Sequence, residues 1–209
     1  MMRNNTKKDQ LINRIIQTEW MMFDRVENQG GRAACQDDAW TFYAMRYSQH
    51  NAFSEATLTS YEQDLQTAQQ EGRNLLFEKY AYMMEYTDPA YFKEKLRLVL
   101  PAVSEEKAAL VEEIAELSVE FQLEFEQNYP YFAKAGRPVT GTEGSQVSLN
   151  VYAIGELKTY SVNTLKLYLQ DMQQSRRSGI NTAFLIHRST AEFYGYESIE
   201  AAEERLKNQ

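Results

Sequence analysis

The chain has 209 residues, a net charge of −8 and one cysteine, and these values exclude several classes of protein. A chain of this length buries enough apolar surface to fold without a disulfide or a structural metal, and we expect a single domain over residues 1–209. The N-terminus lacks the apolar run of a signal peptide, and no window approaches the roughly 20 apolar residues that span a bilayer. We therefore expect a cytoplasmic protein without membrane contact, and the excess of acidic residues disfavours nucleic-acid binding.

Apolar residues recur at spacings of three and four along nearly the whole chain, so we expect an all-α fold. The predicted helices begin at capping residues and end at glycine or proline. In chain order they run from Thr6 to Asn28, from Asp37 or Asp38 through Tyr47, from Ser54 or Thr57 to Gly72, from Asn74 to Tyr86, from Asp88 to Pro101, from Ser104 to Asn128, from Ser148 to Lys158, from Ser161 to Ser178, from Asn181 to Tyr194, and from Ser198 onward.

The stretch "YFAKAGRPVTGTEGSQ", Tyr131 to Gln146, interrupts this helical pattern. It holds three glycines and a proline, and the residues Val147, Leu149 and Val151 that follow alternate as a short strand would. We expect one long loop or a small hairpin around 131–147. The predicted fold is a compact bundle of about eight to ten helices.

No motif for a metal, a nucleotide or a nucleophilic serine is present. His50 and His187 stand far apart and outside any H-E-x-x-H pattern, so we expect no metal site and interpret both as surface or packing residues. No glycine-rich phosphate loop follows a strand, and no G-x-S-x-G elbow occurs. The sequence therefore predicts no cofactor.

One pattern stands above its expected frequency. The dipeptide Gly-Arg occurs three times, at Arg32, Arg73 and Arg137, whereas nine glycines and twelve arginines in this length predict about 0.5 occurrences. Each pair lies at a predicted helix boundary or in the long loop, where glycine can adopt a positive φ. An arginine offers a planar fork of donors that suits carboxylate or phosphate. Three converging arginines would form an anion pocket, whereas separate ones would pair with acids or with helix-end carbonyls.

Should these arginines point inward, they need a ligand or an internal acid, because an unpaired buried charge is costly. Glu19, Glu78 and Glu156 are the expected internal partners, since each lies in or beside an aromatic-rich helical stretch. We hypothesise a crevice for a small anionic or polar ligand. Its candidate binding residues are Arg32, Arg46, Arg73, Arg137, Trp20, Trp40, Tyr43 and Glu78.

Cys35 lies just before a predicted helix start, where the helix dipole lowers the pKa of a thiol. Asp37 and Asp38 oppose a thiolate there, and no histidine is near in sequence to act as a base. We therefore favour a buried, unreactive Cys35 over an exposed thiol or a nucleophile.

The stretch "EWMMFDRVENQGGRAACQDDAWTFYAMRYSQ" resembles an uncharacterised bacterial family, the domain of unknown function numbered 4125. The likeness continues through "EGRNLLFEKYAYMMEYT", "NYPYFAKAGRP" and "GELKTYSVNTLKLY", and covers about 17–202. It implies an intracellular bacterial helical protein without an established activity, so it supplies no catalytic residues. The resemblance also suggests relatives beside a nucleotidyltransferase-like domain; this chain lacks the Gly-Ser and paired aspartates of such a domain, so any such link would run through a partner protein.

Three interpretations of function remain open. The first is the anionic or polar ligand crevice. The second is a protein interaction module, which would need an exposed apolar patch rimmed by polar residues. The third is an enzyme that uses glutamate and arginine for acid–base chemistry, which would need titratable groups with displaced pKa values in one cleft.

Overall fold

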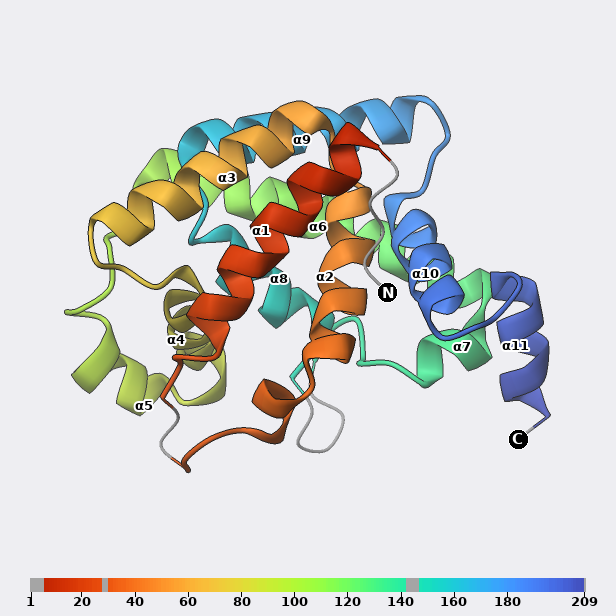
Figure 1. Cartoon of the computed structure of the whole chain (residues 1–209), viewed down its shortest axis with the longest axis horizontal. Coiled ribbons are helices and arrows are strands. Elements are labelled where there is room, and N and C mark those ends of the chain that lie inside the picture. The colour runs from red at the N-terminus through yellow and green to blue at the C-terminus, as the bar shows by residue number, and fades with distance from the viewer. Residues whose placement is uncertain (1–5, 28–29, 142–146, 209) are drawn as a thin grey trace.

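The computed structural model describes residues 6–27, 30–141 and 147–208, and within these ranges every regular element is a helix (Figure 1). The predicted all-α class is thereby confirmed. The elements are α1 (Lys7–Phe23), the 3₁₀ turn η1 (Ala34–Asp37), α2 (Ala39–Asn51), α3 (Glu55–Gln70), α4 (Leu75–Thr87), α5 (Pro89–Tyr91), the π-helical turn η2 (Phe92–Leu96), α6 (Glu105–Asn128), α7 (Pro130–Lys134), α8 (Leu149–Leu157), α9 (Val162–Arg177), α10 (Thr182–Phe193) and α11 (Ile199–Lys207).

Most helices begin where their capping residues predict. The side chain at the N-cap accepts a hydrogen bond from a first-turn N–H, which satisfies one of the unpaired donors of the helix start. Serine does this for α3, α6, α8, α9 and α11, whose caps are Ser54, Ser104, Ser148, Ser161 and Ser198. The carboxylates of Asp38 and Asp88 serve α2 and α5 in the same way. The predicted starts of these helices are therefore confirmed.

Two expected helices are shorter than their sequence pattern. α1 ends at Phe23 rather than near Asn28, a residue that lies outside the described ranges. The run from Asp88 to Pro101 is not one helix, because α5 spans only Pro89–Tyr91 and gives way to the wider turn of η2. There the N–H of Arg97 bonds the carbonyl of Phe92, five residues back, at 2.9 Å.

The expected loop or hairpin around 131–147 is partly helical. α7 occupies its first residues, and no described residue of this stretch belongs to a strand; 142–146 lie outside the described ranges. Leu149 opens α8 instead of alternating as a strand residue. The N–H groups of Leu149 and Asn150, in the first turn of α8, have no acceptor within that helix. They donate instead to the carbonyls of Pro138 and Val139, at 2.9 and 3.1 Å. The two sides of the loop therefore pair through a helix start rather than through a strand.

The helices cross one another in layers (Figure 1). α1 crosses the front and contacts α2, α3 and α4, and α8 lies behind it against α4 and α6. α3 and α9 lie side by side along one edge, while α7, α10 and α11 gather at the end near the C-terminus. α8 is therefore central, and side chains from α1, α2 and α4 can reach it.

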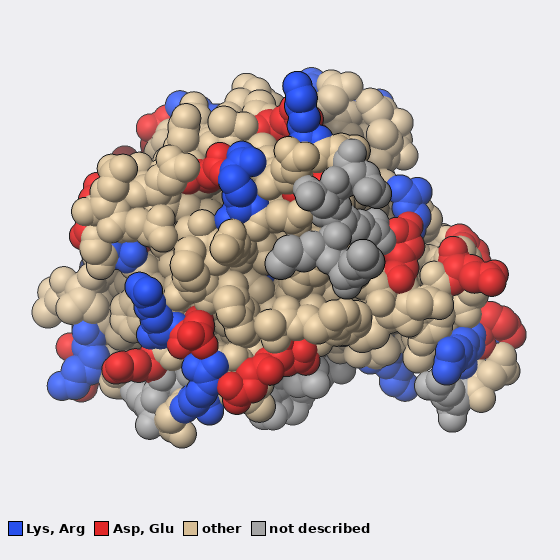
Figure 2. Space-filling view, viewed as in Figure 1, with Lys and Arg blue, Asp and Glu red and all other residues tan. Residues whose placement is uncertain are grey.

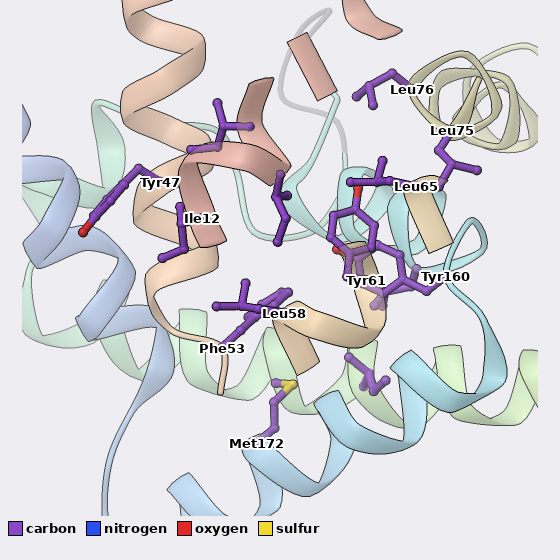
Figure 3. Close-up of a cluster of buried hydrophobic side chains, with 14 of the residues drawn as sticks. Ile12, Tyr47, Phe53, Leu58, Tyr61, Leu65, Leu75, Leu76, Tyr160 and Met172 are labelled. Carbon is purple, nitrogen blue, oxygen red and sulfur yellow. The ribbon is translucent and has the colours of Figure 1, made fainter. Parts of the chain in front are cut away.

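The main hydrophobic core fills the space between these helices (Figure 3). Ile12, Leu58 and Tyr61 contribute to it from α1 and α3, and the rings of Tyr61 and Tyr160 lie 4.6 Å apart. A second, smaller hydrophobic cluster consists of Ala81 and Tyr82 of α4, Leu96 of η2, and Leu100. Partly buried apolar side chains pack against this cluster. The region of α5 and η2 thus has a small apolar base of its own.

Candidate functional site

Buried charged and polar side chains meet at the centre of the bundle. We call this group the Arg46 network. Its members are Glu19 of α1, Arg46, Gln49 and His50 of α2, Tyr61 of α3, Lys79 of α4, Glu156 of α8 and Tyr160, which follows α8.

Arg46 is the hub of this network. Its Nε donates to Glu19 Oε2 at 2.9 Å, and one Nη donates to the other oxygen of Glu19, which makes the pair bidentate. The remaining N–H groups reach the two Glu156 oxygens at 2.9 and 3.1 Å and Gln49 Oε1 at 2.7 Å. A guanidinium has five N–H donors, so this set uses all of them. Arg46 keeps no donor for an external anion.

The two carboxylates are held in their charged form. Burial raises the pKa of Glu19, but the charges and hydrogen bonds of Arg46 and His50 outweigh burial and lower that pKa to about 2. Burial likewise opposes the charge of Glu156, and Arg46 and Lys79 hold its pKa well below the usual range. Neither group can act as a general acid near neutral pH.

Two tyrosines complete the carboxylate shells. Tyr61 donates to Glu19 Oε1 at 2.8 Å, and Tyr160 donates to Glu156 Oε1 at 2.7 Å. Burial and these carboxylates raise the pKa of each tyrosine well above its usual value. His50 is fully buried beside Glu19, with Nε2 at 3.1 Å from Oε2. The arrangement keeps each hydroxyl protonated as a fixed donor.

Lys79 lies at one edge of the network, near the rings of Tyr80 and Tyr152. Its Nζ donates to Glu156 Oε2 at 2.6 Å and lies 5.5 Å from the ring centre of Tyr152. The guanidinium of Arg137 stacks over the same ring at 4.6 Å. Each of the two buried carboxylates therefore has at least one cationic partner inside the protein, Arg46 for both and Lys79 for Glu156.

The three Gly-Arg arginines do not converge. Arg32 is exposed and bonds the carboxylates of Asp24 at 2.6 Å and Asp37 at 2.8 Å. Arg73 forms a bidentate pair with Glu78, both bonds at 2.8 Å.

Arg137 stacks on Tyr152 as described and also donates to the carbonyl of Val147 at 3.3 Å. Arg32 and Arg73 thus each have local acidic partners, and Arg137 is tied to the start of α8. Of the three expected internal acids, Glu78 pairs with a Gly-Arg arginine, whereas Glu19 and Glu156 pair with Arg46.

The predicted aromatic residues lie in separate contacts. Trp20 packs edge-on against Phe42 at 5.1 Å. Trp40 is exposed and meets Tyr194 at the end of α10, with ring centres 5.2 Å apart. Tyr43 is buried and donates to Asn13 at 3.0 Å. Each of these three aromatic residues therefore contacts a residue outside the predicted set, whereas Arg73 and Glu78 are two predicted residues that pair with each other.

The expectation that Cys35 is buried is wrong. Cys35 is exposed on η1, and its neighbour Gln36 is the buried residue of that turn. The side-chain amide of Gln36 donates to the carbonyls of Phe23 and Val26, both at 2.9 Å, and so ties η1 to the end of α1. Because the 3₁₀ turn points Gln36 inward, the adjacent thiol faces outward.

The interpretation of both histidines as surface or packing residues holds for His187 only. His187 stacks on Phe125 with ring centres 4.1 Å apart. His50 belongs to the Arg46 network. The sequence carries a signal for this: Tyr43, Arg46, Tyr47 and His50 share one helical stripe of α2, so their polar members face inward together.

The sequence interpretation also missed an exposed apolar surface. We call residues 89–100 the lobe, which comprises α5, η2 and the turn after it. Leu98 is 87% exposed and Val99 is 67% exposed, and Tyr86, next to the lobe, is exposed as well. Lys93, Lys95 and Arg97 are exposed on the same segment, and no acidic residue in the described ranges pairs with them. On the face shown in Figure 2, positive and negative side chains are interspersed.

Neither a cluster of metal-ligand side chains nor a long apolar helix occurs among the described residues. No group of three or more His, Cys, Asp or Glu side chains among them could hold a metal ion. Within those same ranges, no helix has the length and apolar content needed to cross a membrane.

Comparison with known families gives a match over most of the chain. The model of the family described as "Protein of unknown function (DUF4125)" matches residues 9–204 of this chain. No curated protein and no solved structure matches it. Because the match spans nearly the whole chain, the chain belongs to the DUF4125 family.

Proposed function

We propose that this member of the DUF4125 family is a protein interaction module that docks a partner through the lobe. The exposure of Leu98 and Val99, at 87% and 67%, is the observation that carries the proposal. Isolated exposed apolar residues are ordinary, but Leu98 and Val99 are adjacent in the chain and both are strongly exposed, and contiguous exposed apolar surface is what marks a contact site.

The backbone of the lobe supports this proposal. Leu98 lies two residues from both Leu96 and Leu100, so it falls on the opposite side of the chain from these two buried leucines. The π-helical turn η2 ends at Leu96, directly before this exposed segment. Leu96 and Leu100 then anchor the lobe on the small second core, while Leu98 and Val99 lie between these anchors and face outward. Single π-helical turns cost regular hydrogen bonding and recur at functional sites.

The charges of the lobe indicate what kind of partner fits. Lys93, Lys95 and Arg97 precede the apolar pair and form no ion pair with a described residue, although the whole chain carries a net charge of −8. With the exposed Glu94, the lobe has three basic residues and one acidic residue. A partner that presents apolar side chains beside carboxylates would match both properties. We therefore assign the lobe to an acidic, partly apolar segment of another protein.

The other two interpretations have less support in the geometry. The ligand crevice needs arginines with free donors, whereas Arg46 uses every donor internally, and Arg32 and Arg73 already bind acids. The acid–base interpretation needs a group that titrates near neutral pH, whereas Glu19 and Glu156 have lowered pKa values.

Site-specific photo-crosslinking tests the proposal. A photoreactive benzoylphenylalanine is placed at Leu98 or, as a matched control, at Leu123, an exposed leucine of α6 that is 41% exposed. The proposal predicts one discrete crosslinked partner from position 98, attached at a segment rich in Asp or Glu, and none of it from position 123. Equal products from both positions, or crosslinks only to a second copy or to lipid, would overturn it.

A further inference from the structure

A cleft of about 280 Å³ lies where the C-terminal end of α6 meets the turn between α9 and α10. It is separate from the lobe and from the Arg46 network. Its lining residues are Glu124, Phe125, Asn128, Tyr129, Gly179, Ile180, Asn181, Phe184 and Leu185. The volume approaches the range of small-molecule sites.

Three of the nine residues that line this cleft are aromatic. The rings of Phe125 and Tyr129 lie 5.2 Å apart, and those of Tyr129 and Phe184 lie 5.8 Å apart. Tyr129 is fixed by its hydroxyl, which donates to Glu200 Oε1 at 2.9 Å. Ring faces carry partial negative charge, so they attract a cation as well as apolar groups.

The charge of the cleft has one sign. Glu124 is its charged lining residue, and none of the lining residues is lysine or arginine. The C-terminal dipole of α6 and the N-terminal dipole of α10 both end here and oppose each other, at about half a charge each, so the full charge of Glu124 decides the field. His187, which stacks on Phe125, adds no charge at pH 7 because burial lowers its pKa to about 4.

The carboxylate of Glu124 is held in place by Asn181. The Asn181 amide donates to Glu124 Oε2 at 3.1 Å and to the carbonyl of Phe121 at 2.9 Å. No described residue donates to the other oxygen, Oε1. Glu124 therefore lines the cleft with one carboxylate oxygen that has no donor among the described residues.

We propose that this cleft binds a small organic ammonium ion, with the charged nitrogen on Glu124 and the apolar body against Tyr129 and Phe184. The combination of one positioned carboxylate with several rings is the chemistry that recognises such cations. This inference is independent of the docking role of the lobe, because no lining residue belongs to residues 89–100.

Three probes of similar shape and different charge test the inference: 2-phenylethylammonium, 2-phenylethanol and phenylacetate. Binding to the full chain is measured by isothermal titration calorimetry, and its location by the amide NMR shift of Gly179. The ammonium is expected to bind saturably, with an affinity about tenfold higher than the alcohol. Phenylacetate is expected to bind more weakly than either.

Two glutamine variants assign the effect to one carboxylate. Glu124→Gln should reduce the affinity for the ammonium to that for the alcohol, whereas Glu126→Gln, an exposed neighbour on α6 that does not line the cleft, should leave it unchanged. Both positions are exposed, so both variants should keep the wild-type melting temperature. Absence of saturable ammonium binding, equal affinity for phenylacetate, or an equal loss in both variants would overturn the inference.

Discussion

Arg46 shows how one side chain can serve the interior rather than a ligand. Its fork of donors suits an external anion, and that is why the sequence favours it as a ligand residue. Glu19 and Glu156 are 137 positions apart in sequence, and nothing in their spacing predicts that both reach the same guanidinium. Glu19 does lie on the apolar stripe of α1 between Ile16 and Phe23, so its burial is foreseeable even though its partner is not.

Replacement of Arg46 by methionine should strongly destabilise the fold. Arg46→Met leaves two buried carboxylates without their main partner, and we expect the free energy of unfolding to fall by about 3 to 5 kcal/mol. The control is Arg176→Met, which breaks an exposed pair with Glu120 and should cost less than about 1 kcal/mol. Chemical denaturation measures both. A loss for Arg46→Met no larger than for the control would contradict this account of the network.

The lowered pKa of Glu19 predicts acid sensitivity. Its pKa is about 2 in the folded chain, whereas an ordinary glutamate has a pKa of 4.5, so its stabilising contribution is present above pH 4.5 and is lost as the pH falls toward 2. Glu19→Gln should therefore flatten the dependence of unfolding free energy on pH within that window. Denaturation curves taken at intervals from pH 5 to about 2 measure this. An unchanged slope in the variant would be inconsistent with the prediction.

His187 predicts a second effect of pH, in a higher window. Burial lowers its pKa from 6.5 to about 4, so the neutral ring stabilises the fold above pH 6.5 and this contribution is lost as the pH falls toward 4. His187→Gln removes the titrating ring. It keeps a polar side chain for Gln122, whose Oε1 lies 2.9 Å from Nε2 of His187. The variant should show a smaller decrease in melting temperature between pH 6.5 and 4. If the melting temperatures of the wild type and the variant fell by the same amount between pH 6.5 and 4, the prediction would be refuted.

The helices α3 and α9 each place an aspartate at the N-terminal end of the other. Asp171 of α9 accepts hydrogen bonds from Ser54 N–H at 2.9 Å and Thr57 hydroxyl at 2.6 Å at the start of α3. Asp64 of α3 accepts from Ser161 N–H at 2.9 Å, and also from Thr164, at the start of α9. The two helices are therefore antiparallel and fixed in register by side chains whose partners lie about 100 residues away in sequence.

The contact between α4 and α8 depends on Gly155. A Cβ at this position would lie 2.5 Å from Met83 Cγ and 2.8 Å from the carbonyl oxygen of Lys79, and the latter belongs to the backbone and cannot move alone. Gly155→Ala should lower the free energy of unfolding by about 1 to 3 kcal/mol, although alanine is the better helix former. Denaturant titration tests this, and a variant as stable as the wild type would show that α8 can shift without cost.

The helices of the fold can be predicted from the sequence more completely than the surfaces proposed here to be functional. Helix starts follow from local caps such as Ser104 and Asn181, and inward faces follow from spacing, because both depend on neighbouring residues. The Arg46 network and the cleft at Glu124 depend on which helices meet, and that is set by packing over long distances in sequence. The exposure of the lobe is a different case: Leu98 lies two residues from both Leu96 and Leu100, and that spacing alone places it on the other side of a helix from those two buried leucines.

The central claim is that the lobe, rather than the buried arginine network, makes contact with a partner. The most direct test is the yield of the crosslink from position 98 in a chain that also carries Lys93→Glu and Lys95→Glu. Both lysines are exposed and unpaired, so the melting temperature should stay within the range of ordinary surface variants. We predict that the yield falls about tenfold, since like charges then face an acidic partner. An unchanged or increased yield would contradict the claim.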